Sequence, residues 1–183
     1  DHPLNQFKEI FDDYKIVDYT KFNIDDNIKD ANIAATLLKI TERKTAKGTS
    51  YGVIKFTDLT SVFELFIFSD TLELNREILK EGNSLIVTLI KIFSNDENKI
   101  KRINVQKIAS LKDLFTKPVT EITFSIKSIK DIDQISNLIK KEGSTVVNIN
   151  VTDKNNDISF KLKNNRFIDR KSINILRNKD ILA

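Results

Sequence analysis

Two neighbouring segments in which apolar and polar residues alternate constrain the fold of this chain more than any other feature. They cover residues 51–57 and 61–68. The positions that share one face of each segment are all apolar: Ile54, Phe56, Phe63, Leu65 and Ile67. A period of two places successive side chains on opposite faces of a β-strand. Because the connection at 58–60 is short, the pattern predicts an antiparallel pair with one face toward a core.

The segments around this pair extend the pattern. In chain order we expect a strand over 28–40, the pair itself, a helix over 70–81, and strands over 84–93 and 99–111. Gly82 is suited to end the helix in a left-handed conformation, and a slip in the apolar pattern near Asp30 predicts a β-bulge. Three strands, a helix and two strands are the order of the OB-fold. We therefore expect residues 28–111 to form a five-stranded OB-fold β-barrel, with its helix between strands three and four.

A small α+β domain is expected to follow at 119–183, after a linker at 112–118 that contains Pro118. Its elements are a strand over 121–126, a helix over 131–141 ended by Gly143, strands over 145–151 and 157–163 joined by a turn at 153–156, and a helix over 171–178. Residues 1–27 combine a short amphipathic helix, Asn5 to Tyr14, with an acidic segment. We interpret them as a connector from an upstream domain.

The amino-acid composition limits the possible bonding sites and the expected cellular location. The chain has no cysteine, so it can form neither a disulfide nor a thiolate metal site. No apolar run reaches the roughly 18–20 residues that cross a bilayer. A cytoplasmic location without membrane contact is therefore expected. The chain starts at Asp1 and contains no methionine, which leads us to expect a piece of a longer protein.

Charge is unevenly distributed along the chain. Residues 1–27 carry 3 basic and 7 acidic side chains, residues 28–111 carry 13 and 10, and residues 112–183 carry 14 and 9. A basic barrel suits a polyanionic partner such as a nucleic acid. A general lysine bias on solvated faces is an equally good interpretation of these numbers.

Catalysis is not expected from these residues. His2 is the single histidine, and no glycine-rich phosphate loop occurs. The pair Asp131 and Asp133 has a spacing that could hold magnesium. However, Asp131 precedes Gln134 by three residues at an expected helix start, which is a capping-box arrangement and the interpretation we favour. We expect no catalytic residue, no metal site and no cofactor in this segment, which is therefore not an enzyme by itself.

A nucleic-acid site is better supported. OB-folds lay the bases of a single strand across strands two and three, while basic loops contact phosphates. The candidate site residues are accordingly Arg43, Lys44, Lys47, Tyr51, Lys55 and Phe66. Tyr51 and Phe66 could instead cover the end of the barrel, and for Phe68 this structural role is the one we expect. Glu64 lies on the same face and opposes the binding of phosphates.

Four short segments resemble one known family, the alpha subunit of bacterial replicative DNA polymerase III. Asp1-His2-Pro3-Leu4 resembles the element that precedes the family's OB domain. Residues 43–48 resemble its basic first loop, 54–60 its strand and turn, and 63–68 its third strand. The resemblance covers 1–111 well and the remainder more loosely. Ser61 and Ser69 depart from the family pattern, in which a Gly and a Pro are common.

The resemblance implies a role for each domain. The barrel would contact single-stranded template DNA next to the upstream polymerase domains, and the second domain would dock the clamp-loader tau subunit. The polymerase's catalytic aspartates lie upstream in that family and are absent here, as is its clamp-binding motif. Two alternatives remain open: a protein-interaction scaffold that does not bind nucleic acid, and a tRNA anticodon-binding OB domain of a class II aminoacyl-tRNA synthetase.

Overall fold

The computed structural model describes residues 1–154 and 156–177. It divides the chain into two compact units, Asp1–Leu114 and Phe115–Ala183. The boundary falls inside the segment expected to be a linker, and helix α3 (Leu111–Thr116) occupies most of that segment. No helix among the described residues is long and apolar enough to cross a membrane.

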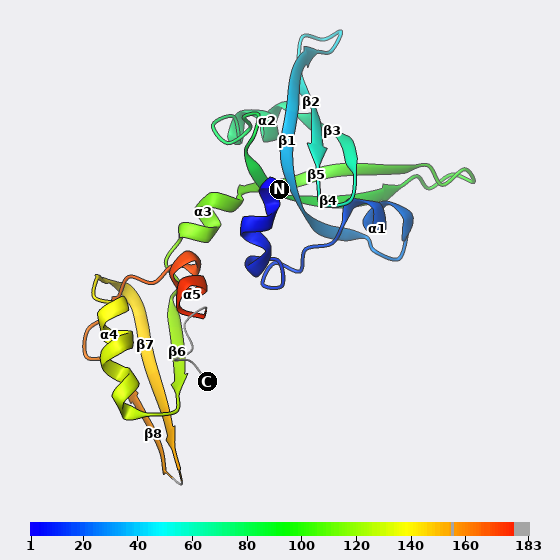
Figure 1. Ribbon diagram of the computed structural model, residues 1–183. Coiled ribbons are helices and arrows are strands. Elements are labelled where there is room, and N and C mark those ends of the chain that lie inside the picture. The colour runs from blue at the N-terminus through cyan, green and yellow to red at the C-terminus, as the bar shows by residue number, and fades with distance from the viewer. Residues whose placement is uncertain (155, 178–183) are drawn as a thin grey trace. The chain divides into compact units, whose positions relative to one another are not determined.

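The first unit contains a five-stranded antiparallel sheet (Figure 1). Its strands are β1 (Asp30–Lys44), β2 (Ser50–Thr57), β3 (Val62–Phe68), β4 (Ser84–Phe93) and β5 (Lys101–Ser110). They are hydrogen-bonded in the order β3-β2-β1-β4-β5, and helix α2 (Ser69–Leu74) lies between β3 and β4 in the chain. The edge strands β3 and β5 lie close to each other but form no ladder in the described chain. This is the expected OB-fold, as a partly open barrel.

The interior of the barrel is filled by the apolar face of each strand. Ile54 and Phe56 of β2 are fully buried, and Phe63, Leu65 and Ile67 of β3 are almost fully buried. The register pairs Phe56 with Phe63 and Ile54 with Leu65, so these side chains occupy the same face across the two strands. The alternation found in the sequence is confirmed at every one of these five positions.

The β-bulge is not where the sequence indicated. Asp30 to Thr36 pair with β4 without interruption, so the bulge expected near Asp30 is absent. The register of β1 against β2 shifts instead between Leu37 and Lys39, which leaves Leu38 as an extra, exposed residue. The bulge occurs where β1 passes from pairing with β4 to pairing with β2, and it permits the bend between the two halves of the barrel.

The N-terminal segment is part of this unit. It forms a 3₁₀ helix, η1 (Pro3–Ile10), where an α-helix over Asn5 to Tyr14 was expected, and a short helix α1 (Tyr19–Ile24). The imidazole Nδ1 of His2 accepts a hydrogen bond from the Leu4 backbone N–H at the start of η1. Four apolar side chains of the segment are buried: Leu4, Phe7, Ile10 and Phe22. These residues thus pack as a cover on the barrel.

Helix α2 is half as long as expected. It ends at Leu74, whereas the spacing predicted a helix to residue 81. The Asn75 side chain donates a hydrogen bond of 2.8 Å to the Thr71 carbonyl and so competes with continued helix formation. The chain then turns back toward β1, where Gly82 N–H donates to the Leu37 carbonyl at 2.8 Å. Gly82 does adopt the expected left-handed conformation, with φ of +88°.

The described residues of the second unit form a three-stranded sheet with helices in the crossover and at the end. Strands β6 (Glu121–Ile126) and β7 (Glu142–Asp153) are parallel, and β8 (Asn156–Lys161) is antiparallel to β7. The crossover from β6 to β7 contains η2 (Ile129–Asp131) and α4 (Ile132–Leu138), and α5 (Arg170–Arg177) ends the described chain. This agrees with the expected α+β architecture. Asn155 of the expected turn and Asn178 of the expected last helix lie outside the described residues.

Two details of this unit differ from the expectation. Asp131 makes no side-chain cap to α4, and the hydroxyl of Ser128 instead accepts from the Lys130 N–H at the start of η2. Gly143 lies inside β7 and does not end a helix. A Cβ at this position would be 2.7 Å from the backbone N and Cα of Phe167, so glycine is required by the close approach of a neighbouring segment.

Candidate nucleic-acid interface

The outer face of β1, β2 and β3 collects the side chains that point away from the barrel core. Cross-strand pairing arranges them in rows, because residues directly opposite each other in an antiparallel sheet share a face. One row contains Arg43, Tyr51 and Phe68. The next contains Thr41, Val53 and Phe66, and a third contains Lys39, Lys55 and Glu64. The face therefore grades from aromatic at one end to charged at the other.

Three aromatic side chains of this face are accessible. Phe66 is 60% exposed and Phe68 is 61% exposed, and Tyr51 is half-buried. The rings of Tyr51 and Phe66 lie 6.4 Å apart between centroids and are inclined by 38°. The expectation that Phe68 covers the end of the barrel is therefore wrong: it alternates with the buried Ile67 and faces solvent. Exposed apolar side chains that form a contiguous patch, unlike single ones, mark contact surfaces.

The β1–β2 loop forms the basic rim of this face. Thr45 and Thr49 join its two ends by a 2.9 Å backbone hydrogen bond, and Gly48 has the left-handed φ of +82° that such a tight turn requires. Arg43 and Lys44 are the last residues of β1, so successive side chains alternate in direction there. Lys47 is exposed at the tip of the loop. The loop thus presents cations in different directions around the aromatic end of the face.

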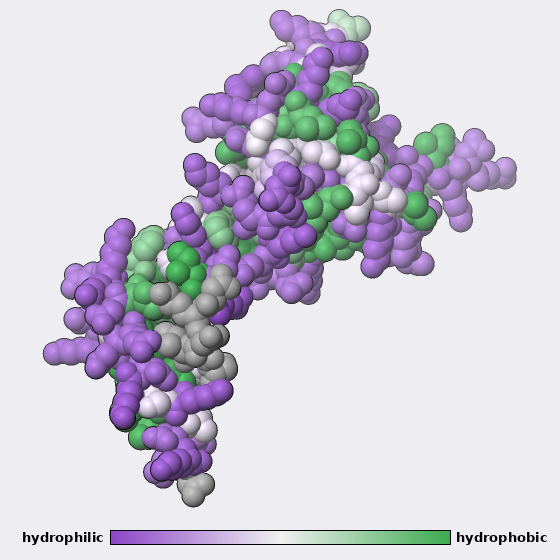
Figure 2. Space-filling model, in the orientation of Figure 1, coloured by the Kyte–Doolittle hydropathy of each residue, from purple (hydrophilic) through white to green (hydrophobic). Residues whose placement is uncertain are grey.

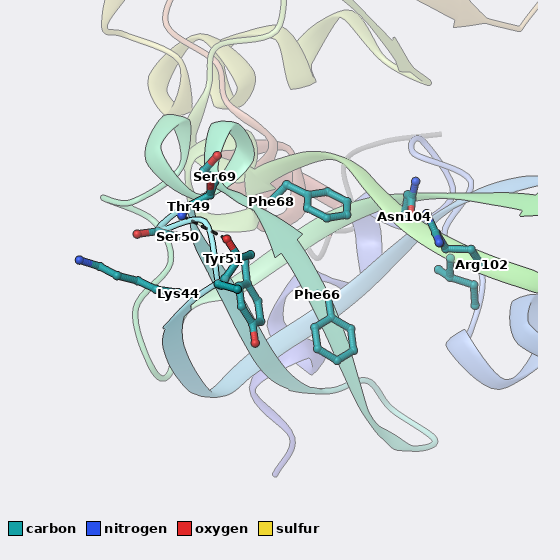
Figure 3. Close-up of a pocket in the computed structure, with 12 residues that line it drawn as sticks. Lys44, Thr49, Ser50, Tyr51, Phe66, Phe68, Ser69, Arg102 and Asn104 are labelled. Atoms are coloured by element: carbon teal, nitrogen blue, oxygen red, sulfur yellow. Dashed lines mark hydrogen bonds between the residues drawn. The ribbon is translucent and has the colours of Figure 1, made fainter.

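A groove of about 670 Å³ opens at this end of the barrel (Figure 3). Three segments line it: the β1–β2 loop, the end of β3, and the first half of β5. Its lining includes Lys44, Tyr51, Phe66, Phe68, Arg102 and Asn104. In Figure 3 the two phenylalanines lie between Tyr51 and the β5 side chains Arg102 and Asn104. The groove exists because β3 and β5 do not close the barrel with a ladder.

A second, smaller groove of about 290 Å³ lies on the same outer face. It is lined by Lys39, Thr41, Arg43, Val53, Lys55 and Glu64. The six predicted site residues are therefore distributed over the surface in three ways. Lys44, Tyr51 and Phe66 line the large groove, Arg43 and Lys55 line the small one, and Lys47 lines neither.

The structure adds residues that the sequence analysis did not select. Phe68, Arg102 and Asn104 line the large groove, and Lys39 lines the small one. Phe68 and Lys39 could have been found from alternation, because each shares a face with predicted residues. Arg102 and Asn104 could not, because they reach the site through the approach of β5 to β3, which leaves no trace in the pattern of either strand.

Arg76 is a basic side chain of this unit that is already paired. Its guanidinium lies 3.0 Å from Glu42 and 2.5 Å from Glu73. The hydrogen bonds from Arg76 hold the pKa of both carboxyl groups below the ordinary range. Glu42 pairs across β1–β2 with Gly52 and so does not belong to the rows of Arg43 and Thr41 on the outer face. The acidic charge of Glu42 is therefore satisfied away from the grooves.

The described residues offer little for metal binding. Among them, no group of three or more His, Cys, Asp or Glu side chains is placed to hold a metal ion. Asp131 and Asp133, the pair considered for magnesium, belong to η2 and α4 of the second unit. Figure 2, which shows one face of the molecule, has apolar surface on the first unit framed by hydrophilic side chains.

Comparison with known proteins gave no family. No family model and no curated protein matches the chain. Among solved structures, two crystal forms of Rim1, the mitochondrial single-stranded DNA binding protein of S. cerevisiae, are similar, with TM-scores of 0.36 and 0.35. Their sequence identities are 15% and 12%, and the matches cover 45% of this chain and 94% and 92% of theirs.

A replication protein A heterotrimer bound to single-stranded DNA is also similar. Its TM-score is 0.34 and its identity 12%, over 67% of this chain and 29% of that chain. These are distant likenesses, and the assignment of the OB-fold made above stands on the strand order and on the position of α2.

Proposed function

We propose that the first unit binds single-stranded nucleic acid on the outer face of β1, β2 and β3. The observation that carries the proposal is the gathering of Tyr51, Phe66 and Phe68 beside a basic rim on a single face. Aromatic side chains stack on any base, and cations track the phosphate backbone, so the combination fits a strand without requiring a particular sequence. The charge of the face is modest, which favours a weak, salt-sensitive hold.

Three further considerations support the choice over a pure interaction scaffold. Lys39, Arg43 and Lys55 share the face with the aromatic side chains. The exposed aromatics alternate with fully packed residues, so the barrel does not need them for its core. Glu64 is a single carboxylate in the third row, where it neighbours Lys55 across the strand pair. The proposed path for phosphates therefore runs by the loop and Arg43 and avoids Glu64.

The finer proposal is that this segment belongs to a replicative DNA polymerase alpha subunit. It rests on the sequence resemblance at residues 1–4, 43–48, 54–60 and 63–68. On that proposal the segment is non-catalytic, the strand is template DNA, the neighbours are upstream polymerase domains, and the second unit docks tau. Co-purification of tagged tau with the chain, and its loss on deletion of 119–183, is the measurement that tests this part.

Binding of fluorescein-labelled oligo-dT, followed by anisotropy over a range of salt, tests the main proposal. The variant Lys44→Glu/Lys47→Glu removes two cations from the rim. We expect weaker binding and a smaller slope of log affinity against log salt, by about 1.4 if each lysine contacts one phosphate. The matched control is Lys8→Glu/Lys80→Glu, the same change of charge at exposed positions of the same unit that line neither groove.

The binding results distinguish the proposed function from its two alternatives. If the two double variants lose the same amount of affinity for oligo-dT, the rim has no specific role, and the assignment of the β1–β2 loop to phosphate binding is wrong. Absence of oligo-dT binding by the wild type favours the scaffold interpretation. A marked preference for structured RNA over oligo-dT favours the anticodon-binding interpretation.

A further inference from the structure

The large groove has two unlike walls. One is aromatic and consists of Tyr51, Phe66 and Phe68. The other is the start of β5, where Arg102 and Asn104 both line the groove. These two residues are separated by one position in a strand and therefore project from the same face of β5. Their cross-strand partners on β4 are Ile92 and Ile90, which confirms the shared face.

The polar side chains of the β5 wall are not paired with other side chains or backbone groups of the described chain. Neither the Arg102 nor the Asn104 side chain makes a hydrogen bond or ion pair with another described residue. The Arg102 guanidinium can only donate hydrogen bonds, whereas the Asn104 amide can both donate and accept them. Polar side chains that converge on a mostly apolar groove determine which ligand is held and in which orientation.

The groove also has a suitable size. Its volume of about 670 Å³ is in the range of pockets that hold molecules larger than one base. A nucleobase whose ring faces the phenylalanines would direct its edge toward β5. Lys44 also lines the groove and supplies a cation for the attached phosphate.

We propose that this groove holds one guanine of the bound single strand and gives the unit a preference for guanine at that position. The inference rests on the proposed function. Guanine presents two neighbouring acceptors, O6 and N7, which match the paired donors of an arginine. It also carries N1–H and N2–H donors, for which the carbonyl oxygen of Asn104 is an acceptor.

The other bases match less well. Adenine has a donor at N6 where guanine has an acceptor, so an arginine donor there would face another donor and leave both unpaired. Cytosine and thymine lack the pair formed by N7 and the six-position oxygen, and their smaller rings cover less of the aromatic wall. Arg102 is therefore the residue that separates guanine from adenine, and Asn104 a second contact that favours guanine.

The test compares 15-nucleotide oligo-dT with versions that carry a single central guanine, adenine, cytosine or 7-deazaguanine. We expect the central guanine to increase affinity at least about fivefold over oligo-dT, and the increase to fall with 7-deazaguanine, which lacks N7. Arg102→Ala should abolish the difference between guanine and adenine, and Asn104→Ala should reduce it. Both residues line a groove and neither is in the barrel core, so the variants are expected to fold.

Lys107→Ala serves as the matched control, because it removes an exposed cation from the same strand at a position that does not line the groove. It should lower affinity for every oligonucleotide by the same factor and leave the guanine preference intact. Binding that is equal for all central bases overturns the guanine pocket and leaves the proposed function standing. A guanine preference that survives in Arg102→Ala overturns it too. No binding to any oligonucleotide overturns both.

Discussion

The backbone N–H of Tyr19 donates a 2.8 Å hydrogen bond to the carboxylate of Asp58, 39 residues further along the chain. The other carboxylate oxygen of Asp58 accepts from Thr60 N–H at 2.8 Å and from Ser61 N–H at 2.7 Å. The Tyr19 ring also stacks on Phe63, with centroids 3.9 Å apart and planes inclined by 6°. A single buried carboxylate thus orders the β2–β3 turn and attaches the start of α1 to the barrel.

Replacing this carboxylate should destabilise the first unit. In Asp58→Ala the backbone donors of Tyr19, Thr60 and Ser61 lose their acceptor, at a cost of about 1–3 kcal/mol for each buried donor left unpaired. Urea unfolding followed by circular dichroism measures the change. Asp12→Ala, at an exposed position of the N-terminal segment, is the control and should change the free energy of unfolding little. Equal stability of the two variants would contradict the role given to Asp58.

The same carboxylate predicts a dependence of stability on pH. Burial by itself would raise the pKa of Asp58, but the hydrogen bonds from Tyr19, Thr60 and Ser61 outweigh it and lower the pKa below 3.8. Its stabilising contribution is therefore fully present above pH 3.8 and is lost as the pH falls through the folded-state pKa. The difference in unfolding free energy between the wild type and Asp58→Asn should be constant near neutral pH and shrink in acid. A difference that grows in acid would show the opposite sign.

Removing the exposed aromatic pair should separate binding from stability. Phe66→Ala/Phe68→Ala is expected to weaken oligo-dT binding by about 1–3 kcal/mol for each base that stacks. Its thermal unfolding midpoint should change little, because both side chains are mostly solvent-exposed. Anisotropy and thermal melts measure the two effects on the same samples. Ile24→Ala removes another exposed apolar side chain, one that is 75% accessible and lines neither groove, and should leave binding unchanged.

The second unit has its own sensitive position. A Cβ on Gly143 would meet the Phe167 backbone at 2.7 Å and the Arg166 carbonyl at 2.8 Å, and backbone cannot move aside as a flexible side chain can. Gly143→Ala should therefore destabilise this unit by about 1–3 kcal/mol. NMR spectra recorded through a urea titration of the full chain follow the two units separately. The urea concentration at which the resonances of residues 121–161 report unfolding should fall, while that of the barrel resonances stays the same. In the control variant Ser144→Ala neither midpoint should change.

How much of this could be predicted from sequence follows from the range of the interactions concerned. Strands β2, β3 and β4 were predicted to within one residue at either end, because alternation is a local signal. The predicted end of α2 was wrong because the hydrogen bond of the Asn75 side chain and the return of the chain to Leu37 override helical spacing. Arg102 and Asn104 were missed because they enter the site through tertiary closure. Phe68 was expected to cover the end of the barrel, although its alternation with the buried Ile67 is the local signal of an exposed side chain.

Strand β1 is shared by both halves of the barrel. Its residues 30–36 pair with β4 and its residues 36–44 pair with β2, so Thr36 belongs to both ladders. Fraying of the edge strands β3 and β5 leaves both ladders of this central strand in place. Its amide hydrogens around Thr36 should consequently exchange with solvent only when the whole unit opens, which makes this short stretch a reporter of global unfolding.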